Sequence, residues 1–168
     1  MKKSLALVLA GTMAFGLTAC GGGKTSTPST TAATEAAAVS EAATEAAKAE
    51  AADLNVGVFY YTYSDTYIAS VRTALDKALG DAGISYQDYD GNSNQTTQNE
   101  QIDTAISQGA NLLIVNIVTS GSVDVSQAIV DKASAAGIPV IFFNRAVESD
   151  EDEGKVLGSY DKCAFVGT

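Results

Sequence analysis

The sequence predicts an α/β domain in which a parallel sheet is flanked by helices on both faces. Short apolar runs alternate with segments of helical spacing between residues 54 and 143. One of these runs, NLLIVNIV, is almost continuously hydrophobic, as expected for a central parallel strand that is covered on both faces. Alternation at a repeat of about 28 residues is typical of strands joined by right-handed helical crossovers.

Four segments are predicted to be strands. The first is apolar and β-branched, and the second alternates at Ile84 and Tyr86. The third is the hydrophobic run, and the fourth has Pro139 near its start, where a missing N–H is tolerated. Their expected bounds are residues 54–60, 84–89, 111–118 and 138–143.

Three segments are predicted to be helices, because their apolar residues recur on one face. Glycines follow the helical spacing and supply the stops, as at Gly109 and Gly137. The expected bounds are residues 65–80, 96–108 and 123–136.

Residues 1–20 have the layout of a secretory signal. Lys2 and Lys3 precede an apolar stretch that is too short to span a bilayer, which takes about 20 residues. The closing LTAC resembles the lipobox of bacterial lipoproteins, and that resemblance implies a lipid anchor on Cys20. The alternative is an ordinary signal peptide with a chance cysteine. The lipobox predicts a protein anchored to the cell membrane and facing the periplasm or the cell exterior.

Residues 21–52 are predicted to be a disordered tether. Thr, Ser, Pro, Ala and Glu dominate the segment, so it cannot bury enough apolar surface to offset its chain entropy. The tether would join the membrane anchor to the folded domain.

Composition excludes several classes of function. The net charge of −10 and the scattered basic residues argue against a nucleic-acid partner. The absence of His removes Ser-His and Cys-His catalysis, and no phosphate-binding glycine motif is present. Cys20 and Cys163 lie in different contexts, so no disulfide is expected, and Cys163 is expected to pack as a small apolar residue. The sequence therefore predicts a binding protein without enzymatic activity.

Candidate ligand contacts follow the strands, because ligands of such sheets bind outside the carboxyl ends of the strands. The turn after the first strand offers Asp65 and Tyr67, which suit a neutral polyol: the carboxylate accepts hydroxyl hydrogen bonds and the ring covers an apolar sugar face. The alternatives are that Ser64 or Asp65 caps the following helix and that Tyr67 packs at the core edge.

Two later strand ends also carry polar residues. Asn116 interrupts the central strand and must be hydrogen-bonded there, either to anchor a loop or to contact a ligand. Asn144 and Arg145 follow the fourth strand and would line the cleft or mark a hinge.

Several separated blocks resemble one known family. YTYSDTYIASVRTAL, NQTTQNEQIDTAISQGANLLIVNIV, IPVIFFNR and SYDKCAFVGT are similar to the galactose/glucose-binding proteins of bacteria, type I periplasmic binding proteins that serve ABC transporters. The resemblance covers residues 53–168. It implies two α/β lobes joined by a hinge that close on one monosaccharide.

The resemblance also implies roles and partners. Asp65 and Asn116 would contact sugar hydroxyls, and Tyr67, where the family usually has Phe, would stack on the sugar. The implied partners are a monosaccharide, the membrane subunits of the transporter and a chemoreceptor. The family's calcium site would lie in the second lobe, so no cofactor is expected in this chain.

The family pattern implies that this chain is an N-terminal fragment. Residues 53–145 would form the first lobe, and residues 146–168 the hinge crossing and the start of a truncated second lobe. A strand at residues 164–167 would then lack partners, and the chain alone would bind sugar weakly or not at all. The nearest rival function is binding of another sugar, such as a pentose or a quorum-signal sugar derivative.

Overall fold

The computed structural model describes residue 51 and residues 53–167. The predicted signal at residues 1–20, including Cys20, and almost all of the predicted tether at residues 21–52 lie outside this part of the chain. The predicted lobe lies within it.

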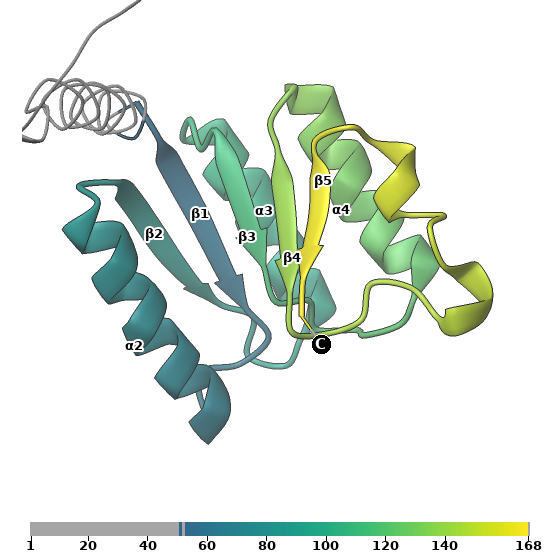
Figure 1. Ribbon diagram of the computed structural model, residues 1–168, viewed down its shortest axis with the longest axis horizontal. Coiled ribbons are helices and arrows are strands. Elements are labelled where there is room, and N and C mark those ends of the chain that lie inside the picture. Colours follow the sequence, from purple (N-terminus) through teal and green to yellow (C-terminus); the bar gives the residue numbers. More distant parts are fainter. Residues whose placement is uncertain (1–50, 52, 168) are drawn as a thin grey trace, which may run out of the picture.

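The described residues form a five-stranded parallel sheet in the order β2-β1-β3-β4-β5 (Figure 1). Its strands are β1 (Asn55–Tyr60), β2 (Ser85–Asp90), β3 (Leu112–Val115), β4 (Val140–Phe143) and β5 (Cys163–Val166). The helices are α2 (Thr66–Asp81), α3 (Gln95–Ser107) and α4 (Val123–Ala136), with 3₁₀ turns η1 (Asp150–Asp152) and η2 (Leu157–Ser159). The predicted fold class, a parallel sheet flanked by helices, is confirmed.

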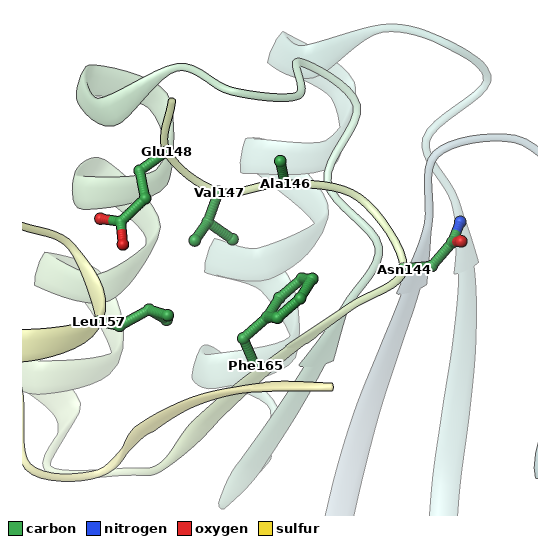
Figure 2. Close-up of a pocket in the computed structure, with 6 residues that line it drawn as sticks. All are labelled: Asn144, Ala146, Val147, Glu148, Leu157 and Phe165. Atoms are coloured by element: carbon green, nitrogen blue, oxygen red, sulfur yellow. The ribbon is translucent and has the colours of Figure 1, made fainter. Parts of the chain in front are cut away.

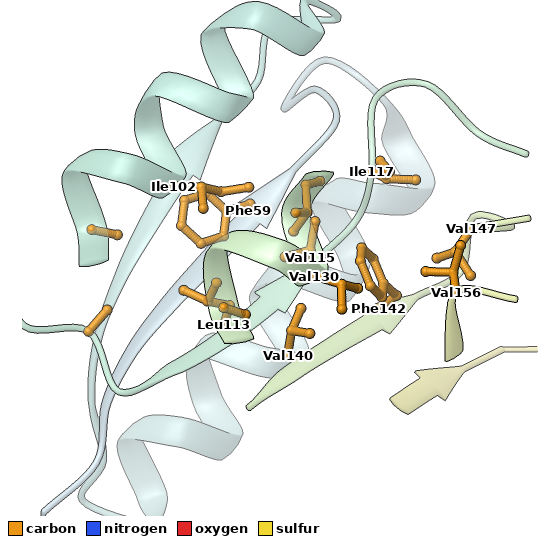
Figure 3. Packing of buried hydrophobic residues seen from close by; sticks show 14 residues of the cluster. Phe59, Ile102, Leu113, Val115, Ile117, Val130, Val140, Phe142, Val147 and Val156 are labelled. Atoms are coloured by element: carbon orange, nitrogen blue, oxygen red, sulfur yellow. The ribbon is translucent and has the colours of Figure 1, made fainter. Parts of the chain in front are cut away.

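The two faces of the sheet bury different sets of strand residues. Helix α2 lies on one face, and α3 and α4 lie on the other (Figure 1). Phe59, Val115 and Phe142 point toward α3 and α4 and form the larger core with Ile102 and Val130 (Figure 3). Val56, Val58 and Tyr60 point the other way, toward α2. This alternation follows from the two-residue period of a strand.

Helix ends agree closely with the glycine and capping signals. Helix α4 has the predicted bounds and ends at Gly137, whose φ of 73° is the left-handed conformation that favours glycine. Helix α3 begins after Asn94, whose side chain accepts a hydrogen bond from the Thr97 amide at 3.1 Å.

Strands β3 and β4 are each at least two residues shorter than predicted, whereas β1 is shorter by one. Strand β3 ends at Val115: the Asn116 amide still donates to the Phe59 carbonyl of β1 at 2.7 Å, but the Val118 amide donates to the Gln98 side chain at 3.1 Å. Strand β4 begins at Val140, directly after Pro139, which has no N–H to donate to the sheet.

The prediction of an unpaired strand at residues 164–167 is wrong. Residues Cys163–Val166 form β5, which pairs in parallel with β4 and extends the same sheet. Glu148 turns the connecting segment back, because its carboxylate accepts hydrogen bonds from the amides of Gly154 at 2.6 Å and Val156 at 2.7 Å. Among the described residues, this strand therefore lies at one edge of the same sheet as β1 to β4.

Candidate functional site

The carboxyl ends of β1, β3 and β4 meet at one edge of the sheet, and the predicted site residues lie there. Asp65 lies at the amino end of α2, where its Oδ1 accepts a hydrogen bond from the Ile68 amide at 2.9 Å. Its Oδ2 accepts one from the Tyr61 hydroxyl at 2.7 Å. Asp65 is therefore the helix cap, and these bonds lower the pKa of its carboxyl group, the Ile68 amide contributing most.

Asn116 is fully buried and links three strands. Its Oδ1 accepts from the Tyr61 amide at 3.3 Å, and its Nδ2 donates to the Phe143 carbonyl at 3.1 Å. Its backbone amide donates to the Phe59 carbonyl at 2.7 Å. The structure thus shows the loop-anchoring role of Asn116, and a contact with sugar stays a prediction.

Tyr67 stands apart from these bonds. Its side chain is 61% exposed on the first turn of α2, so the alternative of packing at the core edge is wrong. An exposed ring in this place has a free face that a sugar could cover. Its role as a stacking residue stays a prediction.

Two glutamines of α3 support this edge and were not predicted from the sequence. Gln98 is fully buried and donates to the Asn116 carbonyl at 3.0 Å, while its Oε1 accepts from the Val118 amide. Gln95 accepts from the Thr119 amide at 2.8 Å. The signal that could have revealed Gln98 is its position, because it shares the buried face of α3 with Ile102 and Ala105.

Arg145 lies directly over the ring of Tyr61. Its guanidinium carbon is 4.4 Å from the ring centroid, and its Nη2 donates to the Val118 carbonyl at 3.0 Å. Arg145 therefore ties the end of β4 to the loops after β1 and β3, and the choice between lining a cleft and marking a hinge stays a prediction. Before it, Asn144 adopts a φ of 63° as the chain leaves β4.

A hollow of about 290 Å³ lies beside this edge, over β4 and β5 (Figure 2). Val147, Leu157 and Phe165 point into it, whereas the Asn144 side chain points away (Figure 2). Both Glu148 oxygens already accept backbone hydrogen bonds. The hollow thus offers apolar contact and few free polar groups, unlike the edge at Asp65.

The remaining chemistry of the described residues is limited. Across residues 51 and 53–167, no cluster of three or more His, Cys, Asp or Glu side chains could hold a metal ion. Cys163 is part-buried, and burial together with Glu148 raises the pKa of its thiol to about 11. That thiol is therefore protonated at neutral pH. None of the helices in this part of the chain has the length and apolarity of a membrane span.

An open parallel sheet with bonded polar groups at its carboxyl edge defines an α/β ligand-binding lobe. The protein-family comparison agrees: residues 56–168 match the model of the periplasmic binding protein domain. The chain therefore belongs to the periplasmic binding protein family.

Two related proteins are themselves described as sugar-binding proteins. The D-galactose/methyl-galactoside binding periplasmic protein MglB of Haemophilus influenzae is 34% identical over 119 residues, which cover 70% of this chain and 34% of MglB. The ribose import binding protein RbsB of Bacillus subtilis is 23% identical, over 68% of this chain and 38% of its own length. The chain thus spans just over a third of the length of these relatives.

A solved structure shows the same fold. An ABC transporter solute binding protein from Mycobacterium smegmatis, solved with bound glycerol, superposes with a TM-score of 0.52 and 27% identity. The match covers 57% of this chain and 32% of that protein. The lobe described above therefore corresponds to one part of a larger binding-protein architecture.

Proposed function

We propose that the protein binds a monosaccharide of the galactose/glucose class outside the cell membrane and delivers it to an ABC importer. The observation that carries the proposal is the ionised Asp65 carboxylate at the carboxyl edge of the sheet. An ionised carboxylate is a strong acceptor for the vicinal hydroxyls of a sugar. The galactose-binding relative, at 34% identity, supports this class of ligand.

In this proposal Asp65 accepts sugar hydroxyl hydrogen bonds and Tyr67 stacks on the ring. Asn116 is the third proposed contact; because it is fully buried here, the sugar reaches its Oδ1 only if the residues that cover it move. A lipid on Cys20 anchors the protein to the membrane, and the transporter's membrane subunits and a chemoreceptor are its partners. No residue described here needs a cofactor for this role, and the proposed calcium site belongs to a second lobe.

Calorimetric titration tests the ligand class. Galactose and glucose are titrated into the full-length product of the gene that encodes this chain, with ribose as the competitor for the pentose alternative. We expect micromolar or tighter binding of galactose or glucose and weaker binding of ribose. Preferential binding of ribose would favour the pentose function, which the ribose-import relative supports.

A pair of variants separates the two roles of Asp65. Asn caps a helix about as well as Asp, whereas Ala does not. We therefore expect Asp65→Ala to lower Tm by several degrees and Asp65→Asn to leave it nearly unchanged. Both variants should weaken galactose and glucose binding by tenfold or more, because each removes the charged acceptor. Unchanged affinity in Asp65→Ala would contradict a sugar contact at this residue.

The 168-residue chain itself gives a further prediction. The described residues form a single lobe, so all of the proposed sugar contacts come from one side of the ligand. We therefore expect galactose and glucose to bind the purified chain weakly or not at all. The same calorimetric titration of the purified chain measures this. Micromolar affinity in that titration would show that one lobe suffices.

A further inference from the structure

The carboxylate of Asp65 is held from two sides. Backbone amides of the first helical turn bond it as a cap, the Ile68 amide at Oδ1 being the main contributor. These cap bonds come from the helix alone and leave Oδ2 without a partner outside the helix. The Tyr61 hydroxyl supplies this partner, because it donates to Oδ2 at 2.7 Å from a residue four positions earlier.

Tyr61 is itself held from several directions. Its amide donates to the Asn116 side chain at 3.3 Å, and its carbonyl accepts from the Ser93 amide at 2.7 Å. The guanidinium of Arg145 covers its ring and is fixed by the Val118 carbonyl. Groups that follow β2, β3 and β4 therefore converge on Tyr61: Ser93 and Asn116 fix its backbone, and Arg145 covers its ring.

The charges around Tyr61 favour the same arrangement. The hydrogen bond to Asp65 is the largest cause that raises the pKa of the Tyr61 hydroxyl, so the hydroxyl stays protonated and remains a donor. Arg145 adds a positive charge near Asp65 and contributes to the lowered pKa of that carboxyl group. At neutral pH the Tyr61 hydroxyl is therefore the donor of this hydrogen bond, and the Asp65 carboxylate is the acceptor.

We propose that Tyr61 is a positioning residue of the sugar site: it fixes the Asp65 carboxylate in one orientation before a ligand arrives, and Arg145 clamps Tyr61. This inference rests on the proposed sugar-binding function. A carboxylate that is already oriented loses less conformational freedom on binding, so the arrangement increases affinity without contacting the ligand. The remaining lone pairs of Asp65 then face the open edge as acceptors.

The first test uses the purified 168-residue chain and needs no sugar. Tyr61→Phe keeps the ring beneath Arg145 and removes only the hydroxyl. The Asp65 carboxyl pKa is measured by carbon-detected NMR titration in the unmodified chain and in the variant. We expect the pKa of Asp65 to rise toward its ordinary value in Tyr61→Phe. Tyr63→Phe is the matched control, because Tyr63 lies in the same turn and interacts with Arg72 instead of Asp65.

The second test measures sugar affinity in the full-length gene product. We expect Tyr61→Phe to weaken binding by about two- to tenfold, because a carboxylate that is no longer held must be immobilised when the sugar binds. Tyr63→Phe should leave the affinity unchanged. In an Asp65→Asn background, Tyr61→Phe should cause little further loss, because the two residues act as a unit.

Three results would overturn the proposal. An unchanged Asp65 pKa in Tyr61→Phe would show that the hydroxyl does not hold the carboxylate. A raised pKa with unchanged sugar affinity would show that the holding does not serve binding. If the unmodified full-length protein binds no sugar, the proposed function and the positioning role both fail, while the pKa measurement still decides whether Tyr61 holds Asp65.

Discussion

Gln98 and Asn116 lie fully buried beneath the carboxyl edge, and each bonds backbone groups with both ends of its amide. Neutral amides suit this place because they offer a donor and an acceptor without the desolvation cost of a charge. The loops that carry the candidate site therefore rest on two buried amides. The sequence reveals Asn116, because it interrupts an apolar strand, whereas Gln98 is revealed only by its spacing from Ile102 and Ala105 on the buried face of the helix.

Replacing Gln98 tests this support. Gln98→Met keeps the length of the side chain but leaves the Asn116 carbonyl and the Val118 amide without their partners. We expect the free energy of unfolding to fall by about 2–3 kcal/mol, which urea denaturation followed by circular dichroism measures. Gln87→Met is the control, because Gln87 is exposed on β2. Equal losses in the two variants would argue against a supporting role for Gln98.

Helix α2 runs from the candidate site to a pair of neighbouring carboxylates, Asp76 and Asp88. The helix begins at the Asp65 cap and carries Asp76 further along, close to Asp88 of β2. Burial, followed by the Asp76 carboxylate, raises the pKa of Asp88 to about 7, and Arg72 opposes this shift. Oxygens of Asp76, Asp88 and Tyr60 have no hydrogen-bond partner there. Asp88 therefore holds a proton below neutral pH.

This pair predicts that stability depends on pH. The folded pKa of Asp88 lies above its unfolded value of 3.8, so the unfolded chain releases the proton first as pH rises. The free energy of unfolding should then fall between about pH 4 and pH 7 and level off above pH 7. The full shift would correspond to about 4 kcal/mol, but both side chains are part-exposed and solvent screening reduces the expected loss to about 1–2 kcal/mol.

The measurement compares urea denaturation of the unmodified chain and of Asp88→Asn from pH 4.5 to pH 8. Asp88→Asn cannot ionise, so its stability should change less with pH over this range and exceed that of the unmodified chain at pH 8. Asp81→Asn is the control, because Asp81 is exposed and pairs with Lys77 at the end of the same helix. An identical fall with pH in Asp88→Asn would assign the dependence to other groups.

The elements themselves were predictable to different degrees. Alternating apolar runs and glycine stops defined the first four strands and three helices, because these signals lie within each segment. Strand β5 was assigned to the wrong sheet, because its pairing depends on Val147 and Val156 entering the core and on Glu148 turning the loop back. These contacts lie in the irregular segment between β4 and β5, where the hydrophobic residues follow neither the spacing of a helix nor that of a strand. Pattern analysis of the sequence therefore could not predict them.

Across the whole molecule, the sheet is covered unequally. Helices α3 and α4 cover one face, and of the helices within residues 53–167 only α2 lies on the other, near β1 and β2 (Figure 1). Beside α2 lies an apolar hollow of about 490 Å³, lined by side chains of α2, β3, β4 and β5, including Ile114, Ile141 and Phe143. Val166 borders it and is 62% exposed. Exposed apolar surface of this kind binds hydrophobic probes.

The hollow gives a prediction for the purified chain. We expect it to enhance the fluorescence of a naphthalene-sulfonate dye, and Val166→Glu to reduce this enhancement several-fold by placing a charge at the hollow. Tyr67→Glu is the matched control, since Tyr67 is 61% exposed but lies outside the lining. If both variants reduce the signal equally, the dye does not report on the hollow.

Strand β1 lies inside the sheet although it comes first among the strands along the chain. It pairs with β2 on one side and, across a much longer separation, with β3 on the other. Parallel pairs of this kind close long loops and form slowly. During synthesis, the apolar strand Asn55–Tyr60 therefore keeps one open edge until Leu112–Val115 has been made. In a chain that is still being made, β1 therefore presents an unpaired apolar edge to its surroundings.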